Sequence, residues 1–411
     1  MAAFPQPPTV LTFEDARHLV ERHAAQVKPR PPESVGLLAG IGRVLAEPIA
    51  ADRDFPPFRR AMRDGYAVRA ADLAQLPATL ELIAEIRAGA PPADLPPEIG
   101  PGQAAAIMTG ASTPPGADAV VMVEYTSLAG KQVTITRGVA SGDNIAPAGS
   151  EARGGQTLLH PGTRIGHSAI AVAASVGQES VRVFPRPTVT ILATGDEVVG
   201  IADTPGPNQI RNSNSYSLAT QVRNAGGGPR LLGVARDDVG HLRELIQQGL
   251  QQDLLLLAGG VSVGKYDLVE QVLDELGAEF LFTGAQIQPG RPIVFGRAQS
   301  KFFFGLPGNP VSTMVTFELF ARPLLEALAG MTPRKLRFLH ARLKSEIKTK
   351  TGLKRFLPGL LCGEFEHAEV ELVRWHGSGD IVCTARADCF VVVPPDRERI
   401  APGEWVAVMR I

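Results

Sequence analysis

The sequence predicts a multidomain protein of the α/β plus β class, and three observations carry this prediction. The chain has 411 residues, too many for one hydrophobic core, so two to four domains are expected. Between residues 187 and 329, short apolar runs alternate with helical patterns, which indicates a parallel or mixed sheet with helices on both faces. The segments 58–149 and 332–411 contain short strand-like runs between Gly and Pro turns, which favours two smaller β-domains.

Composition argues against several classes of protein. The 41 Lys and Arg residues balance the 42 Asp and Glu residues to a net charge of −1, so no nucleic-acid partner is expected. No apolar stretch approaches the ~20 residues that span a bilayer, and the first residues lack the pattern of a secretory signal. The cysteines at 362, 383 and 389 have no metal-ligand spacing and are expected to be reduced thiols in a cytoplasmic protein.

The first half of the chain begins with an expected helix over residues 12–25, where Thr12 and Asp15 make a start that resembles a capping box. A further apolar helix within 150–184 is expected to end at Gly177. Between these two helices, strands are expected at 80–86, 119–123 and 132–136.

The α/β region starts with the β-branched run Thr188–Ala193. The next expected elements are helix 215–224, strand 231–234, helix 239–251, strand 254–258, helix 267–276, strand 302–304 and helix 311–329. Because crossovers between parallel strands are right-handed, the loops that follow the strands should meet at one edge of the sheet. Strands of the C-terminal segment are expected at 370–373, 381–384, 390–393 and 405–409.

Three glycine-containing loops follow strands of this sheet: Thr194-Gly195-Asp196-Glu197, Gly259-Gly260-Val261-Ser262-Val263-Gly264 and Gly305-Leu306-Pro307-Gly308-Asn309-Pro310. Glycine lets backbone N–H groups approach a ligand closely, and the N-terminus of a following helix favours an anion. Ligands of open α/β sheets bind outside the carboxyl ends of the strands. The three loops therefore predict a crevice for an extended, phosphate-bearing ligand.

Two of these loops have further features. The loop at 259–264 has the glycine spacing of a P-loop, but Tyr266 stands where the Mg²⁺-binding hydroxyl belongs, which excludes that motif. In the loop at 305–310, Asn309 can cap the next helix, Pro310 takes its first position, and Ser312 follows.

Acidic residues lie beside the same loops. Carboxylates near phosphates often hold a bridging Mg²⁺, and Glu197, Asp237 and Asp267 are the candidates. Each also has a structural alternative: Asp267 with Glu270 fits a capping box, Asp237 fits a cap for the helix near 239, and Glu197 fits a solvated turn. The residues alone leave both interpretations open.

Longer motifs extend the pattern over the whole chain. In order, they read RDGYAVRAADL (63–73), IMTGASTPPGADAVVMVE (107–124), GSEARGGQTLLHPGTRIG (149–166), QIRNSNSYSL (209–218), GGVSVGKYDLVEQVLDELG (259–277), PGRPIVFG (289–296) and FGLPGNPVSTMVTFELFARPLL (304–325). Together they strongly resemble the molybdopterin molybdenumtransferase family, which is MoeA-like and related to the gephyrin E domain.

The resemblance implies four domains. An elongated linker and dimerisation domain would take residues 1–50 and 150–185, with a β-rich domain inserted at 51–149. A central α/β molybdopterin-binding domain would take 186–331, and a small C-terminal β-domain would take 332–411.

The resemblance also implies an activity and partners. The family inserts molybdate into adenylylated molybdopterin, cleaves the phosphoanhydride with Mg²⁺ and releases AMP and molybdenum-molybdopterin. It forms cytoplasmic homodimers, and the active cleft lies between the α/β domain of one subunit and the inserted domain of the other. Molybdopterin adenylyltransferase and molybdoenzyme maturation proteins are further expected partners, whereas nucleic acid and membranes are not.

Site residues carry over by position. The implied catalytic set is Asp64, Glu197, Asp237 and Asp267, of which the last three would hold the metal. The implied substrate-binding set is Thr109, Ser112, Thr194, Gly195, Gly259, Gly260, Ser262, Gly264, Arg291, Pro307, Gly308, Asn309, Pro310 and Ser312.

The chain departs from the family before the Pro-Gly-Arg-Pro turn. Two family lysines are replaced by Gly284 and Gln288, so only Arg291 keeps a positive charge there. Arg59, Arg60 and Arg63 could supply charge from the facing side, or could form a basic surface loop. These departures leave two alternatives to the transferase that prefers molybdate. One is a non-catalytic molybdopterin-binding or scaffold protein, and the other is a homologue that prefers tungstate.

Overall fold

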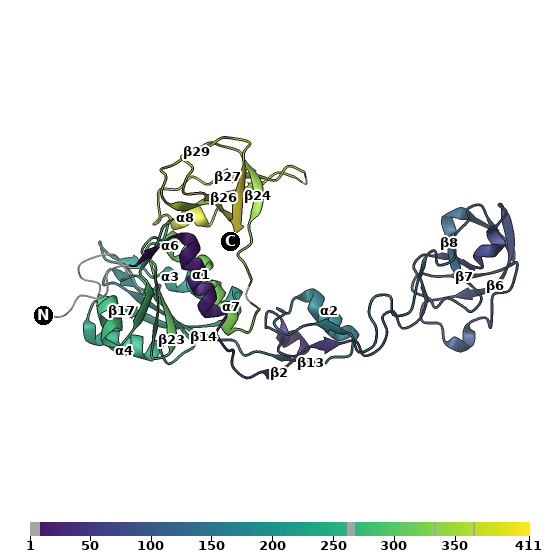
Figure 1. Ribbon diagram of the computed structural model, residues 1–411, viewed down its shortest axis with the longest axis horizontal. Coiled ribbons are helices and arrows are strands. Elements are labelled where there is room, and N and C mark those ends of the chain that lie inside the picture. The colour runs from purple at the N-terminus through teal and green to yellow at the C-terminus, as the bar shows by residue number, and fades with distance from the viewer. Residues whose placement is uncertain (1–8, 261–267, 333, 365) are drawn as a thin grey trace. The chain divides into compact units, whose positions relative to one another are not determined.

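The computed structural model describes residues 9–260, 268–332, 334–364 and 366–411. The chain forms two compact units. The first contains the residues up to Ala46, Gly162–Gly166 and Ser180–Ile411, and the second contains Glu47–Pro161 and His167–Glu179. Figure 1 labels the helices and strands of both units.

A six-stranded mixed sheet forms the centre of the first unit, in the order β17-β14-β18-β23-β22-β19. The first four strands are parallel, as the alternating pattern predicts, and the last two run antiparallel to their neighbours. Their bounds are β17 Gly228–Ala235, β14 Thr188–Thr194, β18 Leu254–Ala258, β23 Lys301–Leu306, β22 Val294–Ala298 and β19 Glu279–Phe282.

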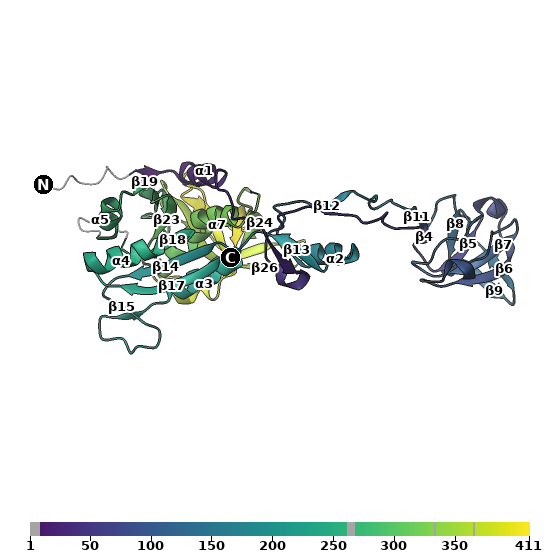
Figure 2. The same ribbon diagram turned by 90° about the horizontal axis from the view of Figure 1, so that it is seen from below.

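Helices cover both faces of this sheet (Figure 2). Strand β18 is buried throughout because successive side chains enter opposite cores. Leu254 and Leu256 join the core that contains α3 (Asn214–Asn224). Leu255 and Leu257 pack with the helices on the opposite face, α4 (Val239–Gly249) and α5 (Leu268–Glu275). The two-faced arrangement predicted from the sequence is confirmed.

The N-terminal helix α1 (Phe13–Ala24) packs in the α/β core through Phe13, Ala16, Val20 and Ala24. The hydroxyl of Thr12 accepts a hydrogen bond from the Asp15 N–H at 3.1 Å, as the cap pattern predicts. The helix therefore lies with the α/β domain, although the family resemblance implies that residues 1–50 belong to the linker domain.

The single helix expected at 311–329 is interrupted. It begins as α6 (Pro310–Thr316), becomes a π-helix over Phe317–Ala321, and continues as α7 (Arg322–Leu328). Pro323 has no N–H and cannot donate to the carbonyl of Leu319 one turn earlier. Arg17 of α1 donates to this carbonyl instead, with Nη1 at 2.6 Å from the oxygen. The proline thus explains why a side chain from another helix enters this turn.

The C-terminal domain is a small β-structure in which β26 pairs with β27 and β28, and β30 pairs with β24 and β28. The bounds are β24 Leu339–Leu343, β26 Lys354–Cys362, β27 Glu369–Leu372, β28 Cys389–Val393 and β30 Trp405–Arg410. The strand predicted at 381–384 is wrong, because Ile381–Thr384 forms the short helix α8. Asp380 caps this helix by accepting a hydrogen bond from the Cys383 N–H at 3.2 Å. All three cysteines are free, and burial raises the pKa of Cys389 to about 12, as expected for a structural thiol.

The second unit is built around a six-stranded sheet in the order β8-β5-β7-β6-β10-β9. The bounds are β8 Ala119–Met122, β5 Gly65–Val68, β7 Gln103–Ile107, β6 Ala78–Ile86, β10 Gln132–Ile135 and β9 Thr126–Ala129. The chain enters and leaves this sheet as a two-stranded antiparallel ribbon, in which β4 (Arg60–Ala61) pairs with β11 (Ile145–Ala146) and Phe55 bridges to Ala152. Farther along the ribbon, β3 (Ile49–Ala50) pairs with β12 (Thr157–Leu159). The helix α2 (His167–Ser175) also belongs to this unit.

Short elements complete both units. They are β1 Val10–Leu11 with β20 Gly284–Ala285, β2 Glu33–Gly36 with β13 Ser180–Val183, β15 Val198–Val199 with β16 Ile210–Arg211, β25 Ile347–Lys348 with β29 Arg399–Ile400, β21 Ile287–Gln288 with β26, and 3₁₀ turns at Leu37–Gly40, Ala70–Leu73, Pro92–Asp94 and Val123–Tyr125. Within the described ranges, no helix combines the length and the apolar character needed to cross a membrane.

Candidate functional site

A cleft of about 670 Å³ lies at the carboxyl ends of the parallel strands of the first unit. All three glycine-containing loops contribute to it, as the right-handed crossover rule predicts. The residues singled out from the sequence that line it are Thr194, Gly195, Glu197, Asp237, Gly259, Gly260, Pro307, Gly308, Asn309 and Pro310. The arrangement brings backbone N–H groups and carboxylates to one surface.

Glycine is required at the turn after β18. Gly259 and Gly260 have φ values of +101° and +65°. A Cβ on Gly259 would lie 2.9 Å from the carbonyl oxygen of Thr194, and one on Gly260 would lie 2.7 Å from the Thr194 hydroxyl oxygen. Both side-chain bulk and the left-handed conformation therefore exclude other residues here, and the backbone stays close to the Thr194 loop.

Two of the three predicted metal ligands line this cleft. Partial burial raises the pKa of Asp237, and the carboxylates of Asp196 and Glu197 nearby raise it further. Concentrated negative charge of this kind suits a divalent cation with oxygen ligands. The alternative role of Asp237 as a helix cap is wrong, because Asp238 accepts the hydrogen bond from the His241 N–H at 2.8 Å.

The third predicted ligand, Asp267, lies outside the described residues, as do Ser262 and Gly264. Among the residues that the structure describes, no group of three or more His, Cys, Asp or Glu side chains is arranged to hold a metal. The described part of the cleft therefore supplies two carboxylates of the predicted set of three.

Two residues that line the cleft carry buried oxygen atoms whose hydrogen-bonding capacity is unused within the described part of the chain. The Thr194 hydroxyl and the Asn214 side-chain oxygen are buried, and neither has a hydrogen-bond partner among the described residues. The Asn214 amide nitrogen donates to the carbonyl of Gly308 at 2.7 Å, which fixes the side chain in the cleft. Unpaired buried oxygens are costly, so both atoms keep an acceptor capacity that the described residues do not use.

Sequence reasoning gave no role to several residues that line the cleft. Arg211, Asn212, Ser213 and Asn214 come from the QIRNSNSYSL motif, and Gly379 comes from the C-terminal domain. The motif was a signal for the first four, because two asparagines precede an amphipathic helix that starts at the same sheet edge. Gly379 had no signal, because its place depends on contacts between distant segments.

The C-terminal domain reaches the cleft through Asn309. Asn309 occupies the N-cap position of α6, but its side chain makes no cap hydrogen bond to the helix. Its amide nitrogen donates instead to the Ser378 hydroxyl at 2.9 Å, and the Val311 N–H donates to the Ser378 carbonyl at 3.1 Å. The predicted cap is therefore wrong at the side chain, because a competing partner from the C-terminal domain is available.

Two predicted substrate-binding residues of the first unit do not line the cleft. Ser312 is buried within α6, and its carbonyl accepts a hydrogen bond from the Thr316 hydroxyl at 2.8 Å. Arg291 is exposed, and it is its neighbour Pro292 that contributes to the lining.

The two departures from the family lie on short strands next to this turn. Gly284 pairs with Val10 of β1, and a Cβ on Gly284 would lie 3.0 Å from a Val10 methyl carbon. The N-terminal strand thus occupies the space that a longer side chain would need. Gln288 is exposed on β21 and pairs with Arg355 of β26.

The remaining predicted residues belong to the second unit. Thr109 donates to one carboxylate oxygen of Asp64 from its N–H at 2.6 Å and from its hydroxyl at 2.8 Å, and these hydrogen bonds hold the pKa of Asp64 below its usual range. Ser112 forms an antiparallel bridge with Arg60. Asp64 is therefore an exposed, ionised carboxylate at neutral pH.

The arginines of this unit differ in their contacts. Arg60 pairs with Glu151 at 2.7 Å, and Arg59 donates to the carbonyl of Ala117 at 3.2 Å. Arg63 is exposed, and it forms no ion pair with the described residues. Arg59 and Arg63 thus keep charge and donors for an anionic ligand, whereas the charge of Arg60 is paired with Glu151.

Three family models match the chain in succession. The MoeA N-terminal region (domain I and II) matches residues 11–177, a model described as "Probable molybdopterin binding domain" matches 190–327, and the MoeA C-terminal region (domain IV) matches 340–411. Their order agrees with the arrangement of β-rich, α/β and C-terminal parts described above.

Whole-chain relatives agree with the family models. The molybdopterin molybdenumtransferase of Bacillus subtilis is 36% identical over 92% of this chain and 90% of its own, and that of a Nostoc species is 35% identical over 92% and 88%. The solved structure of a molybdopterin biosynthesis MoeA protein from Pyrococcus horikosii is 34% identical and covers 98% of this chain and 99% of its own, with a TM-score of 0.69. The chain therefore belongs to the MoeA family of molybdopterin molybdenumtransferases.

Proposed function

We propose that this protein transfers molybdenum from molybdate to adenylylated molybdopterin, with cleavage of the phosphoanhydride and release of AMP. Family membership places the chain in molybdenum cofactor biosynthesis as a transferase. The observation that supports the specific reaction is the cleft, where glycine turns suited to a phosphate meet the carboxylates Glu197 and Asp237.

The residues of the cleft have different roles in this proposal. The turns at Gly259–Gly260 and Pro307–Pro310 present backbone groups to the phosphate of the pterin, and Arg211 adds positive charge. Glu197 and Asp237 would hold Mg²⁺, which neutralises negative charge that develops on the leaving phosphate. Thr194 and Asn214 line the cleft as polar residues that would help to orient the ligand.

We further propose that the protein works as a cytoplasmic homodimer. Asp64 and Thr109 belong to a different unit from the cleft residues. This division supports an arrangement in which the inserted domain of one subunit faces the cleft of the other, as the family resemblance implies. Asp64 is ionised at neutral pH, so it can add a carboxylate to the metal or its waters from the second subunit.

The reaction is tested with purified protein, adenylylated molybdopterin, molybdate and Mg²⁺, and AMP is measured by chromatography. We expect AMP release that depends on both molybdate and Mg²⁺, and its absence at saturating substrate would refute the transferase. A parallel assay with tungstate tests oxyanion choice. Faster turnover with tungstate would favour the alternative suggested by Gly284 and Gln288, whereas binding without turnover would favour a scaffold.

A further inference from the structure

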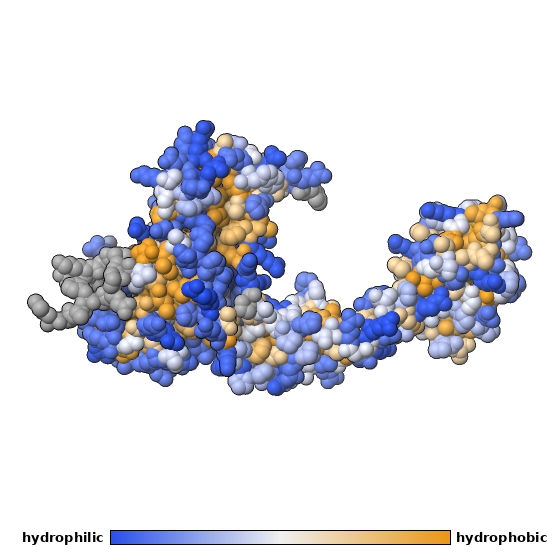
Figure 3. All heavy atoms as spheres, viewed as in Figure 1, coloured by the Kyte–Doolittle hydropathy of each residue, from blue (hydrophilic) through white to orange (hydrophobic). Residues whose placement is uncertain are grey.

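A second pocket of about 360 Å³ lies in the first unit, apart from the residues of the cleft. It is formed by α1, α7, the segment that leads into the C-terminal domain, and the end of β30. Its charged lining consists of Arg17, Arg322, Arg334, Lys335, Arg337 and Arg410 together with Glu318 and Glu326, a formal surplus of four positive charges. Figure 3 shows that hydrophilic residues cover much of the outer surface of the C-terminal domain.

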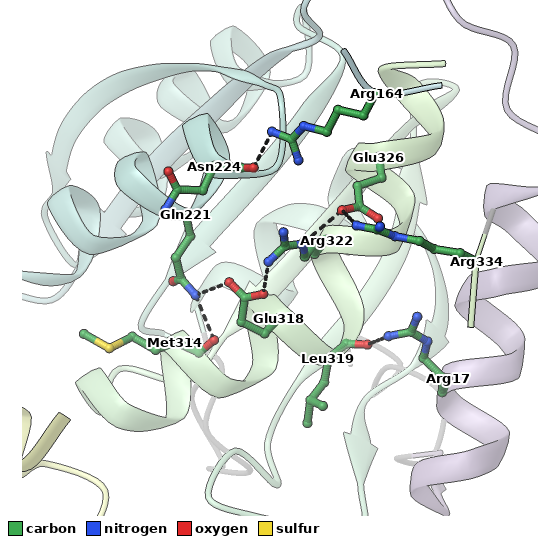
Figure 4. Close-up of polar contacts among 10 residues, drawn as sticks. All are labelled: Arg17, Arg164, Gln221, Asn224, Met314, Glu318, Leu319, Arg322, Glu326 and Arg334. Atoms are coloured by element: carbon green, nitrogen blue, oxygen red, sulfur yellow. Dashed lines mark hydrogen bonds and ion pairs between the residues drawn. The ribbon is translucent and has the colours of Figure 1, made fainter. Parts of the chain in front are cut away.

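The two acids are already engaged by the protein (Figure 4). Glu318 accepts hydrogen bonds from Arg322 at 2.5 Å and from Gln221 at 2.9 Å. Glu326 accepts hydrogen bonds from Arg322 at 3.0 Å and from Arg334 at 3.1 Å. Both carboxylates are thus paired with arginines on one wall of the pocket. Their negative charges offset those of Arg322 and Arg334 and do not compensate the other cations of the pocket.

The other cations face the pocket without such compensation. Within the described ranges, Lys335, Arg337 and Arg410 form no ion pair. Leu336 and Phe338 pack against the core, and the exposed residues Lys335 and Arg337 line the pocket together with Leu336. The pocket therefore gathers like charges along its lining, at a cost in repulsion that a bound anion would relieve.

Arg17 is a buried lining residue of the pocket that two hydrogen bonds hold in place. It is 7% exposed, its Nη1 donates to the Leu319 carbonyl, and its Nε pairs with Glu21 at 2.7 Å. A guanidinium carries five N–H donors, and these two contacts use two of them. Donors remain for an acceptor in the pocket, on a side chain that both α1 and the π-helix hold in place.

We propose that this pocket is a second anion-binding site, which takes a small, multiply charged oxyanion or the phosphate group of a small phosphate ester. The volume admits such a group and excludes a folded partner. Arginine and lysine donors at its wall match the tetrahedral oxygens of phosphate. A bound anion would join α1, α7 and the C-terminal domain, because each supplies part of the wall.

Equilibrium dialysis with radiolabelled inorganic phosphate, at an ionic strength fixed with chloride, tests the site in the full-length protein. The variant Lys335→Gln/Arg337→Gln removes two exposed cations, and Lys350→Gln/Arg374→Gln removes two exposed cations of the C-terminal domain that do not line the pocket. We expect phosphate to bind about tenfold more weakly to the first variant and equally well to the second. We also expect phosphate to raise the Tm of the first variant by less than that of the wild type and of the second variant.

A cleft variant and a second ligand are also measured, to locate the bound anion and to identify its chemical class. Arg211→Gln alters the cleft alone, so phosphate affinity that falls in this variant and not in Lys335→Gln/Arg337→Gln would place the anion in the cleft and overturn the proposal. Equal affinity in all variants would overturn it as well. Glycerol phosphate, used in place of inorganic phosphate, distinguishes the sources: tighter binding identifies a phosphate ester, and equal or weaker binding identifies the free oxyanion.

Discussion

At the scale of single residues, the cleft depends on carboxylates whose surroundings differ. Asp237 lies near Asp196 and Glu197, and its pKa is raised by partial burial and by their charge. Asp64 accepts two hydrogen bonds from Thr109, and its pKa is lowered. The surroundings thus hold the pKa of Asp237 above its usual value and the pKa of Asp64 below it.

The variant Asp237→Asn tests the first of these carboxylates. We expect AMP release to fall at least about tenfold, because a Mg²⁺ ligand is lost. The folded state raises the pKa of Asp237, so ionisation above this pKa lowers stability, and the neutral side chain should slightly raise the Tm of the apoprotein at neutral pH. Thermal melting with and without Mg²⁺ should show a smaller metal-induced rise than in the wild type.

The matched control for this variant is Asp274→Asn, which neutralises an exposed carboxylate of α5 outside the cleft. It should keep the AMP release and the response to Mg²⁺ of the wild type. An unchanged response to Mg²⁺ in Asp237→Asn would show that Asp237 does not hold the metal.

The variant Thr109→Val tests the second carboxylate. It removes the hydroxyl hydrogen bond and keeps the one from the N–H, so the pKa of Asp64 should rise part of the way toward its usual value. The pKa of Asp64 is lowered in the folded protein, so its ionised carboxylate supports function and stability at pH values above this pKa. Both contributions are lost as the pH falls through it. The acidic limb of the pH–rate profile should therefore move to higher pH, and it should stay in place in Thr79→Val, a control on β6 of the same sheet.

At the scale of elements, the four parallel strands and their helices could be predicted from the sequence because the apolar periodicity there is strong. The run Leu254–Leu257 is recognisable as a buried strand from its uninterrupted apolar residues alone. The errors have local physical causes. Ile381–Thr384 has β-branched residues that favour a strand, but Asp380 caps a helix. Helix 311–329 was expected to be continuous, and Pro323 together with Arg17 explains the interruption.

The π-helical turn gives a stability prediction. In Arg17→Met, the carbonyl of Leu319 loses the donor that replaces the missing N–H of Pro323, and we expect a loss of about 1–3 kcal/mol in the free energy of unfolding of the first unit. Urea unfolding measures this loss for the whole unit, and hydrogen exchange of the α1 amides measures it at the helix. Arg22→Met on the exposed side of the same helix should change stability little, and an equal loss in both variants would contradict the role of the carbonyl.

The candidate site could be predicted in part. Its loops follow strands of one sheet, so their meeting at one edge followed from connectivity, and ten of the residues singled out from the sequence line the cleft. The contact between Asn309 and Ser378 could not be predicted, because it joins segments 69 residues apart in different domains. Val10 beside Gly284 is a similar case, since a two-residue strand at the N-terminus leaves no periodic signal.

At the scale of the whole molecule, the homodimer proposal predicts complementation between two inactive variants. Asp64→Ala alters the second unit, and Asp237→Ala alters the first. If a cleft combines the first unit of one subunit with the second unit of its partner, a mixed dimer contains one cleft with both residues intact. Mixing after subunit exchange should restore up to about a quarter of the wild-type AMP release, because half of the dimers are mixed.

Size-exclusion chromatography of tagged and untagged chains must first show that subunits exchange. Mixed preparations in which each variant carries both substitutions serve as the control and should stay inactive. If exchange occurs and the mixture of single variants stays inactive, each subunit completes its own cleft.

The two-stranded ribbon that carries the β-sheet of the second unit has a consequence for protein engineering. Phe55 bridges to Ala152, and Ile49–Ala50 pairs with Thr157–Leu159, so the two ends of the segment 49–159 are hydrogen-bonded side by side. A segment with adjoining ends can be closed with a short linker or transplanted into a surface turn of another protein. The segment 49–159 can therefore be transplanted as one piece. New chain termini placed within its turns would give a circular permutant that keeps every strand pairing of the sheet.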